Sequence, residues 1–254
     1  MSSQKTALVT GTSKGGIGDY LARELHSRGF RVFATARSPT KVEHLKEMGL
    51  DIVLLEVTDS DSIKKAVEKV TEATGGKLDI LVNNSGVDMT PAKAMFDVNV
   101  WAVLELTQAF SPMLIASKGT IVNIGSVAGR LPIPFEGIYN ISKAALEHLS
   151  RQMRVEFAPF DVKVVTGGIK TGFFAHAEET ELPKTSPYYP GREALGPWMK
   201  GEANTTLQPS QSSLIRNLRP LIPYSTSRGD LVLWAMGVPN LKNAIFGSKS
   251  QKTD

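Results

Sequence analysis

Apolar runs typical of β-strands alternate, up to about residue 170, with longer segments whose apolar residues recur at helical spacing. The pattern predicts strands over 5–10, 30–36, 51–57, 78–82, 119–125 and 161–166. It predicts helices between them, over 17–28, 39–48, 60–73, 94–116 and 137–157. Strands that alternate with helices across short links are typical of parallel βαβ units. The sequence therefore predicts an α/β fold built on a parallel sheet.

Two segments depart from this regular alternation. The segment over 94–116 is apolar on almost every side, which predicts a helix that is buried or lies at a subunit interface, and Pro112 is expected to kink it. After Thr171, residues 172–228 combine many Pro, Ser and Thr residues with scattered aromatic residues and show no clear period. Long stretches of this kind are typical of mobile segments or functional lids. We interpret 172–228 as a substrate lid on a single domain spanning 1–254, with 229–247 returning to the core.

Composition narrows the class of protein. The 254 residues are 41% hydrophobic and 21% charged, which is ordinary for a globular domain with a large core. The net charge of +4 is spread along the chain, which disfavours a nucleic-acid surface. The absence of Cys excludes disulfides, thiolate metal sites and a Cys nucleophile. The first residues lack the apolar core of a signal peptide, and no stretch approaches about 18 apolar residues, so no transmembrane helix is expected.

Tyr139 and Lys143 are four positions apart in the helix predicted over 137–157, so their side chains share one face. An ammonium group near a phenol favours the phenolate, and we expect it to lower the pKa of Tyr139 from about 10. Such a phenol is a usable proton donor near neutral pH. Ser126, at the end of the strand predicted over 119–125, is expected to hydrogen-bond the same reacting oxygen. A Tyr and Lys pair alone is common on solvated helix faces, so the hypothesis depends on all three residues.

A glycine-rich loop, TGTSKGGIG over 10–18, follows the first predicted strand and opens the first predicted helix. In this position it makes a tight turn and presents helix N–H groups to a pyrophosphate, which indicates a dinucleotide site. The alternative is a purely structural turn between strand and helix. The expected contacts from the loop are Gly11, Ser13, Lys14, Gly16, Ile17 and Gly18.

The end of the second predicted strand bears on which dinucleotide is bound. Sites that prefer NAD usually place an acid there, but this sequence reads Ala36-Arg37-Ser38. Arg37 offers a planar fork suited to a 2′-phosphate, Lys14 adds a second positive charge, and Ser38 adds a donor. The alternative is that both bases are solvated surface residues. The pattern favours NADPH/NADP⁺ as the cofactor.

With these motifs together, the chain resembles a short-chain dehydrogenase/reductase. The loop has one residue more than the family's usual Thr-Gly-x3-Gly-x-Gly, and in this it is similar to the fungal 1-acyldihydroxyacetone-phosphate reductase-like branch. The resemblance covers roughly residues 5–175. It implies a Rossmann-type doubly wound sheet and hydride transfer between NADPH and a carbonyl group.

The resemblance also implies roles for particular residues. Tyr139 is expected to be the general acid, Lys143 to bind the nicotinamide ribose, and Ser126 to steady the substrate oxygen. Asn99 matches the family's helix Asn, which holds a water that relays protons to the active Lys. Further cofactor contacts are implied at Glu56, Val57, Asn84, Gly86, Ile169 and Thr171. No metal is expected, and the histidines on predicted helices, His26, His44 and His148, are interpreted as surface or structural residues.

The leading hypothesis is an NADPH-dependent carbonyl reductase acting on an apolar or amphiphilic ketone or aldehyde, either a lipid or a secondary-metabolite intermediate. One alternative is an NADPH-binding sensor or scaffold that transfers no hydride. Another is a reductase whose pocket also guides a cyclisation. Family members usually associate, so a homodimer or homotetramer is expected. The expected location is cytoplasmic, with peripheral attachment to endoplasmic reticulum or lipid droplets as the alternative.

Overall fold

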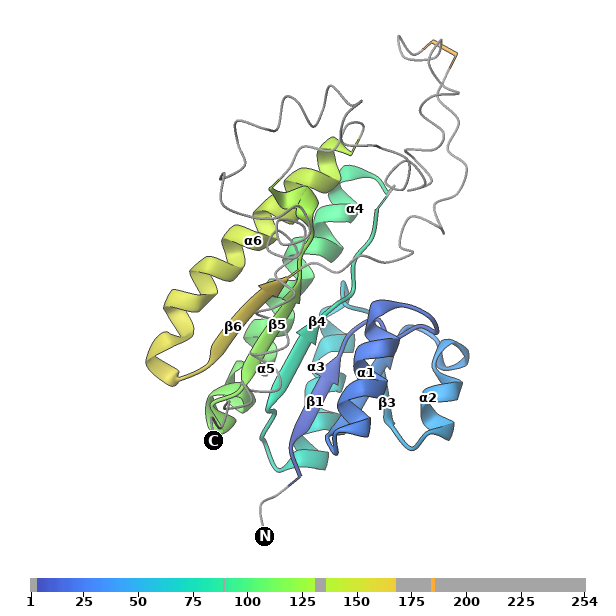
Figure 1. Ribbon diagram of the computed structural model, residues 1–254, viewed down its shortest axis with the longest axis vertical. Helices are drawn as coiled ribbons and strands as arrows, with labels where there is room; N and C mark the ends of the chain where they lie inside the picture. Colours follow the sequence, from blue (N-terminus) through green and yellow to red (C-terminus); the bar gives the residue numbers. More distant parts are fainter. Residues whose placement is uncertain (1–3, 89, 131–135, 168–183, 186–254) are drawn as a thin grey trace, which may run out of the picture. The chain divides into compact units, whose positions relative to one another are not determined.

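The computed structural model describes residues 4–88, 90–130, 136–167 and 184–185. Residues 4–167 belong to one compact unit of the chain. Apart from residues 184 and 185, the predicted lid over 172–228 lies outside the described residues, as does the segment 229–247. In the described part, six parallel strands form one sheet in the order β3-β2-β1-β4-β5-β6 (Figure 1). This is the doubly wound order of the Rossmann fold, and it confirms the predicted fold class.

Each predicted strand is present and contains fewer residues than predicted. The strands are β1 (Thr6–Val9), β2 (Arg31–Ala36), β3 (Asp51–Leu54), β4 (Ile80–Asn83), β5 (Thr120–Ile124) and β6 (Lys163–Gly167). The helices are α1 (Ile17–Ser27), α2 (Glu43–Glu47), α3 (Ser60–Thr74), α4 (Ala92–Phe96), α5 (Ala102–Ser117) and α6 (Gly137–Phe157). Short 3₁₀ turns occupy Pro39–Lys41, Val127–Gly129 and Ala158–Phe160, and a π-helical segment occupies Asp97–Trp101.

The sheet is buried on both faces. Successive residues of a strand point to opposite faces, so each strand contributes to two core clusters. Ala7 and Val9 of β1 pack in one core cluster with Leu25 of α1. Leu8, between them, packs in the other cluster with Leu106 of α5. Figure 1 shows the strands running side by side, with α1 and α2 on one side and α3 and α5 on the other.

Two predicted elements after β2 are shorter than expected. The helix predicted over 39–48 is a 3₁₀ turn at Pro39–Lys41 followed by the short α2. The strand predicted over 51–57 ends at Leu54. Leu55 still donates its N–H to Ala36 O at 3.0 Å, but Glu56 donates its N–H to the Ser62 hydroxyl at 2.9 Å. The chain therefore leaves the sheet because its next polar partner lies in α3.

The helix predicted over 94–116 is a continuous run from Ala92 to Ser117 that contains the π-helical segment before α5. Pro112 lies inside α5, and seven α5 residues, among them Phe110 and Leu114, are buried. By length and composition alone this run is apolar enough to cross a membrane, with a mean hydropathy of 1.3, although the sequence predicts no such helix. Core helices of globular proteins meet the same criterion, and α5 packs in the core beside α3.

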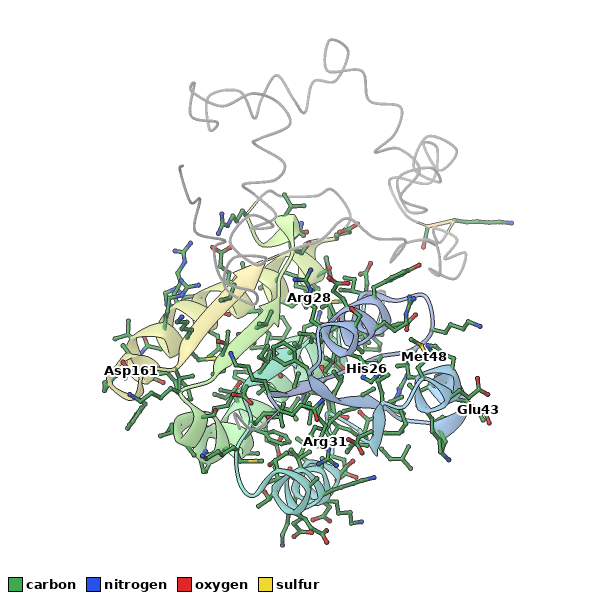
Figure 2. The ribbon with its side chains drawn as sticks, turned by 60° about the horizontal axis from the view of Figure 1, so that its bottom comes forward. His26, Arg28, Arg31, Glu43, Met48 and Asp161 are labelled. Atoms are coloured by element: carbon green, nitrogen blue, oxygen red, sulfur yellow. The ribbon has the colours of Figure 1, made fainter. Side chains whose placement is uncertain are left out.

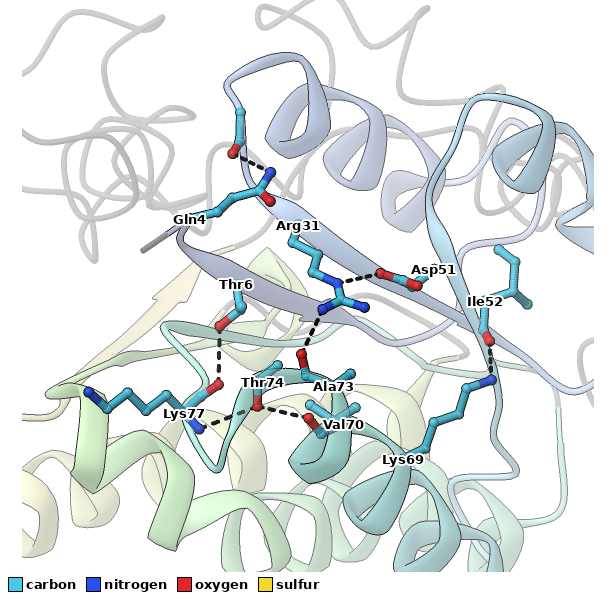
Figure 3. Close-up of polar contacts among 11 residues, drawn as sticks. Gln4, Thr6, Arg31, Asp51, Ile52, Lys69, Val70, Ala73, Thr74 and Lys77 are labelled. Atoms are coloured by element: carbon cyan, nitrogen blue, oxygen red, sulfur yellow. Dashed lines mark hydrogen bonds and ion pairs between the residues drawn. The ribbon is translucent and has the colours of Figure 1, made fainter. Parts of the chain in front are cut away.

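The amino-terminal ends of the strands are held by polar contacts, shown in Figure 3. Arg31 of β2 donates from Nε to Asp51 Oδ2 of β3 at 2.8 Å and from Nη1 to Ala73 O of α3 at 2.6 Å. Lys69 of α3 donates to Ile52 O at 2.8 Å. Figure 2 shows Arg31 at this edge, with His26 and Arg28 at the carboxyl end of α1. These contacts fix β2, β3 and α3 from the edge opposite the candidate site.

Candidate active site

The predicted site residues gather where β1, β4 and β5 end. The strand order reverses between β1 and β4, and ligands of open α/β sheets bind outside the carboxyl ends of the strands at such a reversal. The glycine-rich loop follows β1, Asn84 follows β4, and Ser126 follows β5. The topology therefore brings three motifs, far apart in sequence, to one edge of the sheet.

The glycine-rich loop is packed tightly on its inner side. Gly11 has a positive φ of 69°, a conformation that glycine adopts without strain. A side-chain carbon built at Gly18 would overlap Gly11 O and lie 2.6 Å from Asn84 Nδ2, so this position has no room for a larger residue. Asn84 donates from Nδ2 to Thr10 O at 2.8 Å and Gly11 O at 3.0 Å. Asn84 thus holds the loop in addition to any direct contact with a cofactor.

The outer side of the loop fits a pyrophosphate. Gly16 is the N-cap of α1 and provides no side chain to the N–H groups of the first turn, which are therefore available to an anion. Ser13, Lys14 and Gly16 are exposed, and Ile17 is half-buried. A cradle of exposed backbone with one base beside it matches the chemistry of a dinucleotide phosphate.

Arg37 follows β2, and its side chain is 71% exposed. Its Nη1 lies 3.9 Å from Glu56 Oε2, so an acid does approach this corner, from the segment after β3. Thr58 donates from Oγ1 to Glu56 Oε1 at 3.0 Å, which holds that carboxylate. A solvated pair at this distance is weak, so Arg37 remains suited to a 2′-phosphate. Ser38 lies beside Thr40, Oγ to Oγ1 at 2.8 Å, and Val57 is buried in the core.

The predicted site residues Ser126 and Tyr139 are in direct contact. Ser126 is the N-cap of the turn Val127–Gly129, where its Oγ accepts the Ala128 N–H at 3.2 Å, and its side chain hydrogen-bonds Tyr139. The turn packs closely on α6: a side-chain carbon at Gly129 would lie 2.8 Å from Lys143 O. The absence of a side chain at Gly129 thus allows the approach that joins Ser126 to Tyr139.

Lys143 lies on the same face of α6 as Tyr139, with Nζ 5.7 Å from the centroid of the phenol ring. It is buried, and its Nζ donates to Ile124 O, at the end of β5, at 3.1 Å. A side-chain carbon built at Gly86 would lie 3.6 Å from this Nζ and 3.4 Å from Asn99 Oδ1. Gly86 after β4, the end of β5 and Lys143 of α6 thus lie within a few ångströms of one another.

Asn99 is buried in the π-helical segment, and both ends of its amide are used. Oδ1 accepts the Val87 N–H at 2.9 Å, and Nδ2 donates to Val87 O at 2.9 Å and to Ser142 Oγ at 3.1 Å. Ser142 in turn donates to Tyr139 O at 2.8 Å. Asn99 therefore links the segment after β4 to the helix that carries Tyr139. π-Helical segments of this kind frequently mark functional sites.

The prediction that Lys143 makes the phenol acidic is wrong for this structure. Burial, together with the negative charges of Asp88 and Glu136, raises the pKa of Tyr139 to about 12, and the hydrogen bond with Ser126 acts in the opposite direction. Burial also lowers the pKa of Lys143 to about 8. Burial, which disfavours the charged form of each group, is the largest cause of both shifts.

Two carboxyl groups near Tyr139 were missed by the sequence reasoning. Burial raises the pKa of Glu136 to about 7, and the charge of Asp88 raises it as well. The signals were present: Glu136 is three residues before Tyr139, and Asp88 is two residues after Gly86. The site is therefore more negative than the motif residues alone indicate.

The remaining predicted site residues, Ile169 and Thr171, lie outside the described residues. Across the described ranges, no group of His, Asp and Glu is arranged to hold a metal ion. A hollow is lined by residues of α4 and of the π-helical segment, among them Phe96 and Trp101, and by none of the predicted site residues. The described chemistry is thus gathered at the sheet edge and not in that hollow.

Comparison with known proteins identifies the class of protein. The short chain dehydrogenase family profile matches residues 5–182. The chain belongs to the short-chain dehydrogenase family, and it is therefore an oxidoreductase of the class that the sequence predicts.

Individual relatives show which members of the family this chain is similar to. A short-chain dehydrogenase of Talaromyces islandicus is 43% identical over 199 residues, which cover 72% of this chain and 70% of the relative. The NADPH-dependent 1-acyldihydroxyacetone phosphate reductase of Schizosaccharomyces pombe is 38% identical over 211 residues, 77% of this chain and 71% of the relative. The NADPH-bound carbonyl reductase from chicken fatty liver matches with a TM-score of 0.62 and 31% identity, over 69% of this chain and 84% of that one. The predicted resemblance to the fungal branch is confirmed.

Proposed function

We propose that this chain is an NADPH-dependent carbonyl reductase in which Tyr139 is the general acid. The observation that carries the proposal is the position of the Tyr139 phenol. It is hydrogen-bonded to Ser126, shares a helix face with Lys143, and lies at the same sheet edge as the glycine-rich loop.

The protonation state of Tyr139 bears on the chemical step. A phenol with a pKa of about 12 keeps its proton at neutral pH, which is the form that a proton donor requires. When bound, the nicotinamide supplies the hydride to the carbonyl carbon. Tyr139 gives its proton to the carbonyl oxygen, and Ser126 stabilises the negative charge that develops there.

Lys143 and Asn99 support the donor from two sides. Below its pKa of about 8, Lys143 is mostly protonated, and its charge is suited to the hydroxyl groups of a ribose. Asn99 fixes the start of α6 through Ser142 and the segment after β4 through Val87. The role of Asn99 in holding a proton-relaying water is part of the proposal.

The cofactor is NADPH in this proposal. The uncapped start of α1 suits the pyrophosphate, and Arg37 with Lys14 suits the 2′-phosphate. The relatives support this choice, since the fission yeast reductase is NADPH-dependent and the avian carbonyl reductase was solved with NADPH.

The charges around Tyr139 bear on the substrate. Among the described residues, Asp88 and Glu136 are the groups whose negative charge raises the pKa of Tyr139. Like charges repel at short range, which disfavours a phosphate group beside the phenol. We therefore propose that the substrate is an uncharged apolar ketone or aldehyde and not an acyl ketone phosphate. In this it would differ from the relative named as a 1-acyldihydroxyacetone phosphate reductase.

Turnover separates the reductase from a protein that only binds NADPH. The purified chain is mixed with NADPH and a panel of ketones, which includes uncharged long-chain ketones and an acyl ketone phosphate. NADPH loss is followed by absorbance, and NADPH binding by fluorescence without ketone. The proposal expects binding and NADPH consumption with an uncharged ketone. Binding with no consumption across the panel contradicts it and supports the sensor or scaffold.

Association through α5 and α6 is also part of the proposal. Apolar side chains on or beside these helices are exposed, among them Trp101 at 55%, Ile141 at 55% and Val155 at 71%. Exposed apolar groups at neighbouring helices favour contact with a second copy. A dimer or tetramer is the expected assembly.

A further inference from the structure

Asp19 is a buried carboxylate in the first turn of α1, with only 2% of its surface exposed. Four contacts hold it. Oδ2 accepts the Gly15 N–H at 2.8 Å, and Arg23 donates from Nε to Oδ1 at 3.0 Å and from Nη2 to Oδ2 at 3.3 Å. His44 Nε2 lies 3.0 Å from Oδ1. Buried charges are rare unless they are paired in this way.

The carboxylate stays ionised despite its burial. Burial raises the pKa of Asp19, but the hydrogen bonds from Gly15, His44 and Arg23 outweigh it, and the net pKa lies below its usual value. A buried, ionised and fully engaged side chain directly after the glycine-rich loop is well placed to fix that loop.

One contact of Asp19 is with the loop itself. Gly15 has a φ of 81°, is exposed and lies between Lys14 and Gly16, in the part of the loop that the proposal gives to the pyrophosphate. A side-chain carbon at Gly15 would meet nothing within 4 Å, so no other part of the protein packs against that side of the residue. Its N–H bond to Asp19 is a specific constraint on the conformation of the loop.

Another contact reaches the adjacent segment. His44 belongs to α2, which follows β2 and the segment that carries Arg37 and Ser38. Asp19 and His44 are 25 residues apart in sequence. The same carboxylate therefore contacts the loop suited to the pyrophosphate and the helix that follows the residues suited to the 2′-phosphate.

We propose that Asp19 is a positioning residue that fixes the glycine-rich loop through Gly15 and aligns the 2′-phosphate side through His44. The inference rests on the proposed NADPH site, and it deepens that proposal by naming what sets the geometry of the site. Asp19 acts through backbone and side chains of the protein and does not take part in the chemical step.

The test is direct binding of NADPH and NADH, followed by fluorescence in the absence of any ketone. Asp19→Ala removes the acceptor of the Gly15 N–H, and we expect it to weaken both cofactors about tenfold, since both contain the pyrophosphate. Asp19→Asn keeps an oxygen acceptor and is expected to restore most of the affinity. Unchanged affinity of Asp19→Ala for both cofactors overturns the proposal.

A His44 variant tests the 2′-phosphate side of the site separately from the pyrophosphate side. His44→Ala is expected to weaken NADPH binding several-fold and to leave NADH binding within about twofold, because only NADPH has the 2′-phosphate. An equal loss for both cofactors, or no loss for either, overturns the alignment role of His44.

Glu24 is the matched control. Its carboxylate pairs with Arg28 four residues on, at the C-cap of α1, but both side chains are exposed, at 49% and 42%. Glu24→Ala is expected to bind both cofactors as the parent does. Melting temperatures without cofactor confirm that each variant is folded where binding is measured. In steady state with a ketone, Asp19→Ala is expected to raise the KM for NADPH with kcat within about twofold.

The outcomes also separate this inference from the proposed function. NADPH binding that depends on Asp19, in a chain that consumes no NADPH with any ketone, contradicts the reductase and supports the role of Asp19. Full turnover with unchanged cofactor binding in Asp19→Ala supports the reductase and overturns the role of Asp19.

Discussion

The phenol of Tyr139 has an environment that its sequence neighbours describe only in part. The helical spacing to Lys143 predicts their shared face, and the contact exists. The spacing says nothing of burial, which raises the pKa of Tyr139, or of Asp88, which lies 51 residues earlier in the sequence. The shared helix face of Tyr139 and Lys143 was therefore predictable, whereas the sign of the pKa shift of Tyr139 depends on tertiary packing.

Glu136 offers a test at the scale of one residue. Its pKa rises from 4.5 to about 7 in the folded chain. Between these values the folded state binds the proton more tightly than the unfolded state, so the free energy of unfolding falls as the pH rises through this window. Glu136→Gln removes the ionisation and is expected to be more stable than the parent by about 1 kcal/mol near pH 8, with little difference near pH 4.5.

Urea denaturation at the two pH values measures this effect. Glu68→Gln, at an exposed position of α3, is the control and is expected to change the urea midpoint little at either pH. A Glu136→Gln variant that gains no stability relative to the parent as the pH rises contradicts the raised pKa.

The elements show where sequence patterns are reliable and where they are not. The predicted helix over 137–157 has the observed bounds of α6, because its apolar period is regular and its flanks are Gly- and Pro-rich. The π-helical segment at Asn99 was not predicted, because a local change in hydrogen bonding leaves no mark on an apolar run. The sequence predicts a kink at Pro112. The irregular hydrogen bonding in the structure is the π-helical segment at 97–101.

The close approach of the turn Val127–Gly129 to α6 yields a prediction at the scale of elements. A side-chain carbon at Gly129 would lie 2.8 Å from Lys143 O and 3.0 Å from Ala144 N, both backbone atoms. Gly129→Ala is therefore expected to push the turn from α6, to cost about 1–3 kcal/mol of stability, and to reduce turnover as Ser126 leaves Tyr139.

Gly137 is the control for this substitution. It is the first residue of α6, and a side-chain carbon there would meet nothing within 4 Å. Gly137→Ala is expected to be neutral or slightly stabilising in thermal unfolding, since Ala favours the helix. Equal stability of Gly129→Ala and the parent contradicts the close approach.

For the whole described chain, the order of strands and helices was predictable because each element carries its own period. Contacts between distant elements were not, and Asp19 with His44 is the plainest case, since no spacing rule relates a residue of α1 to one of α2. Family membership, indicated by the glycine-rich loop, Ser126 and Tyr139, predicts which distant elements meet at the site, and periodicity alone does not. The cytoplasmic location, the assembly and the roles of Ile169 and Thr171 stay predictions.

The central claim is that Tyr139 delivers the proton in an NADPH-dependent reduction, and Tyr139→Phe measures it most directly. Tyr20→Phe, at a 62% exposed position of α1, is the matched control. With a ketone that the parent reduces, we expect Tyr139→Phe to bind NADPH but to lose at least about a hundredfold in NADPH consumption, while Tyr20→Phe keeps the parent rate. Turnover by Tyr139→Phe within a few-fold of the parent would contradict the account.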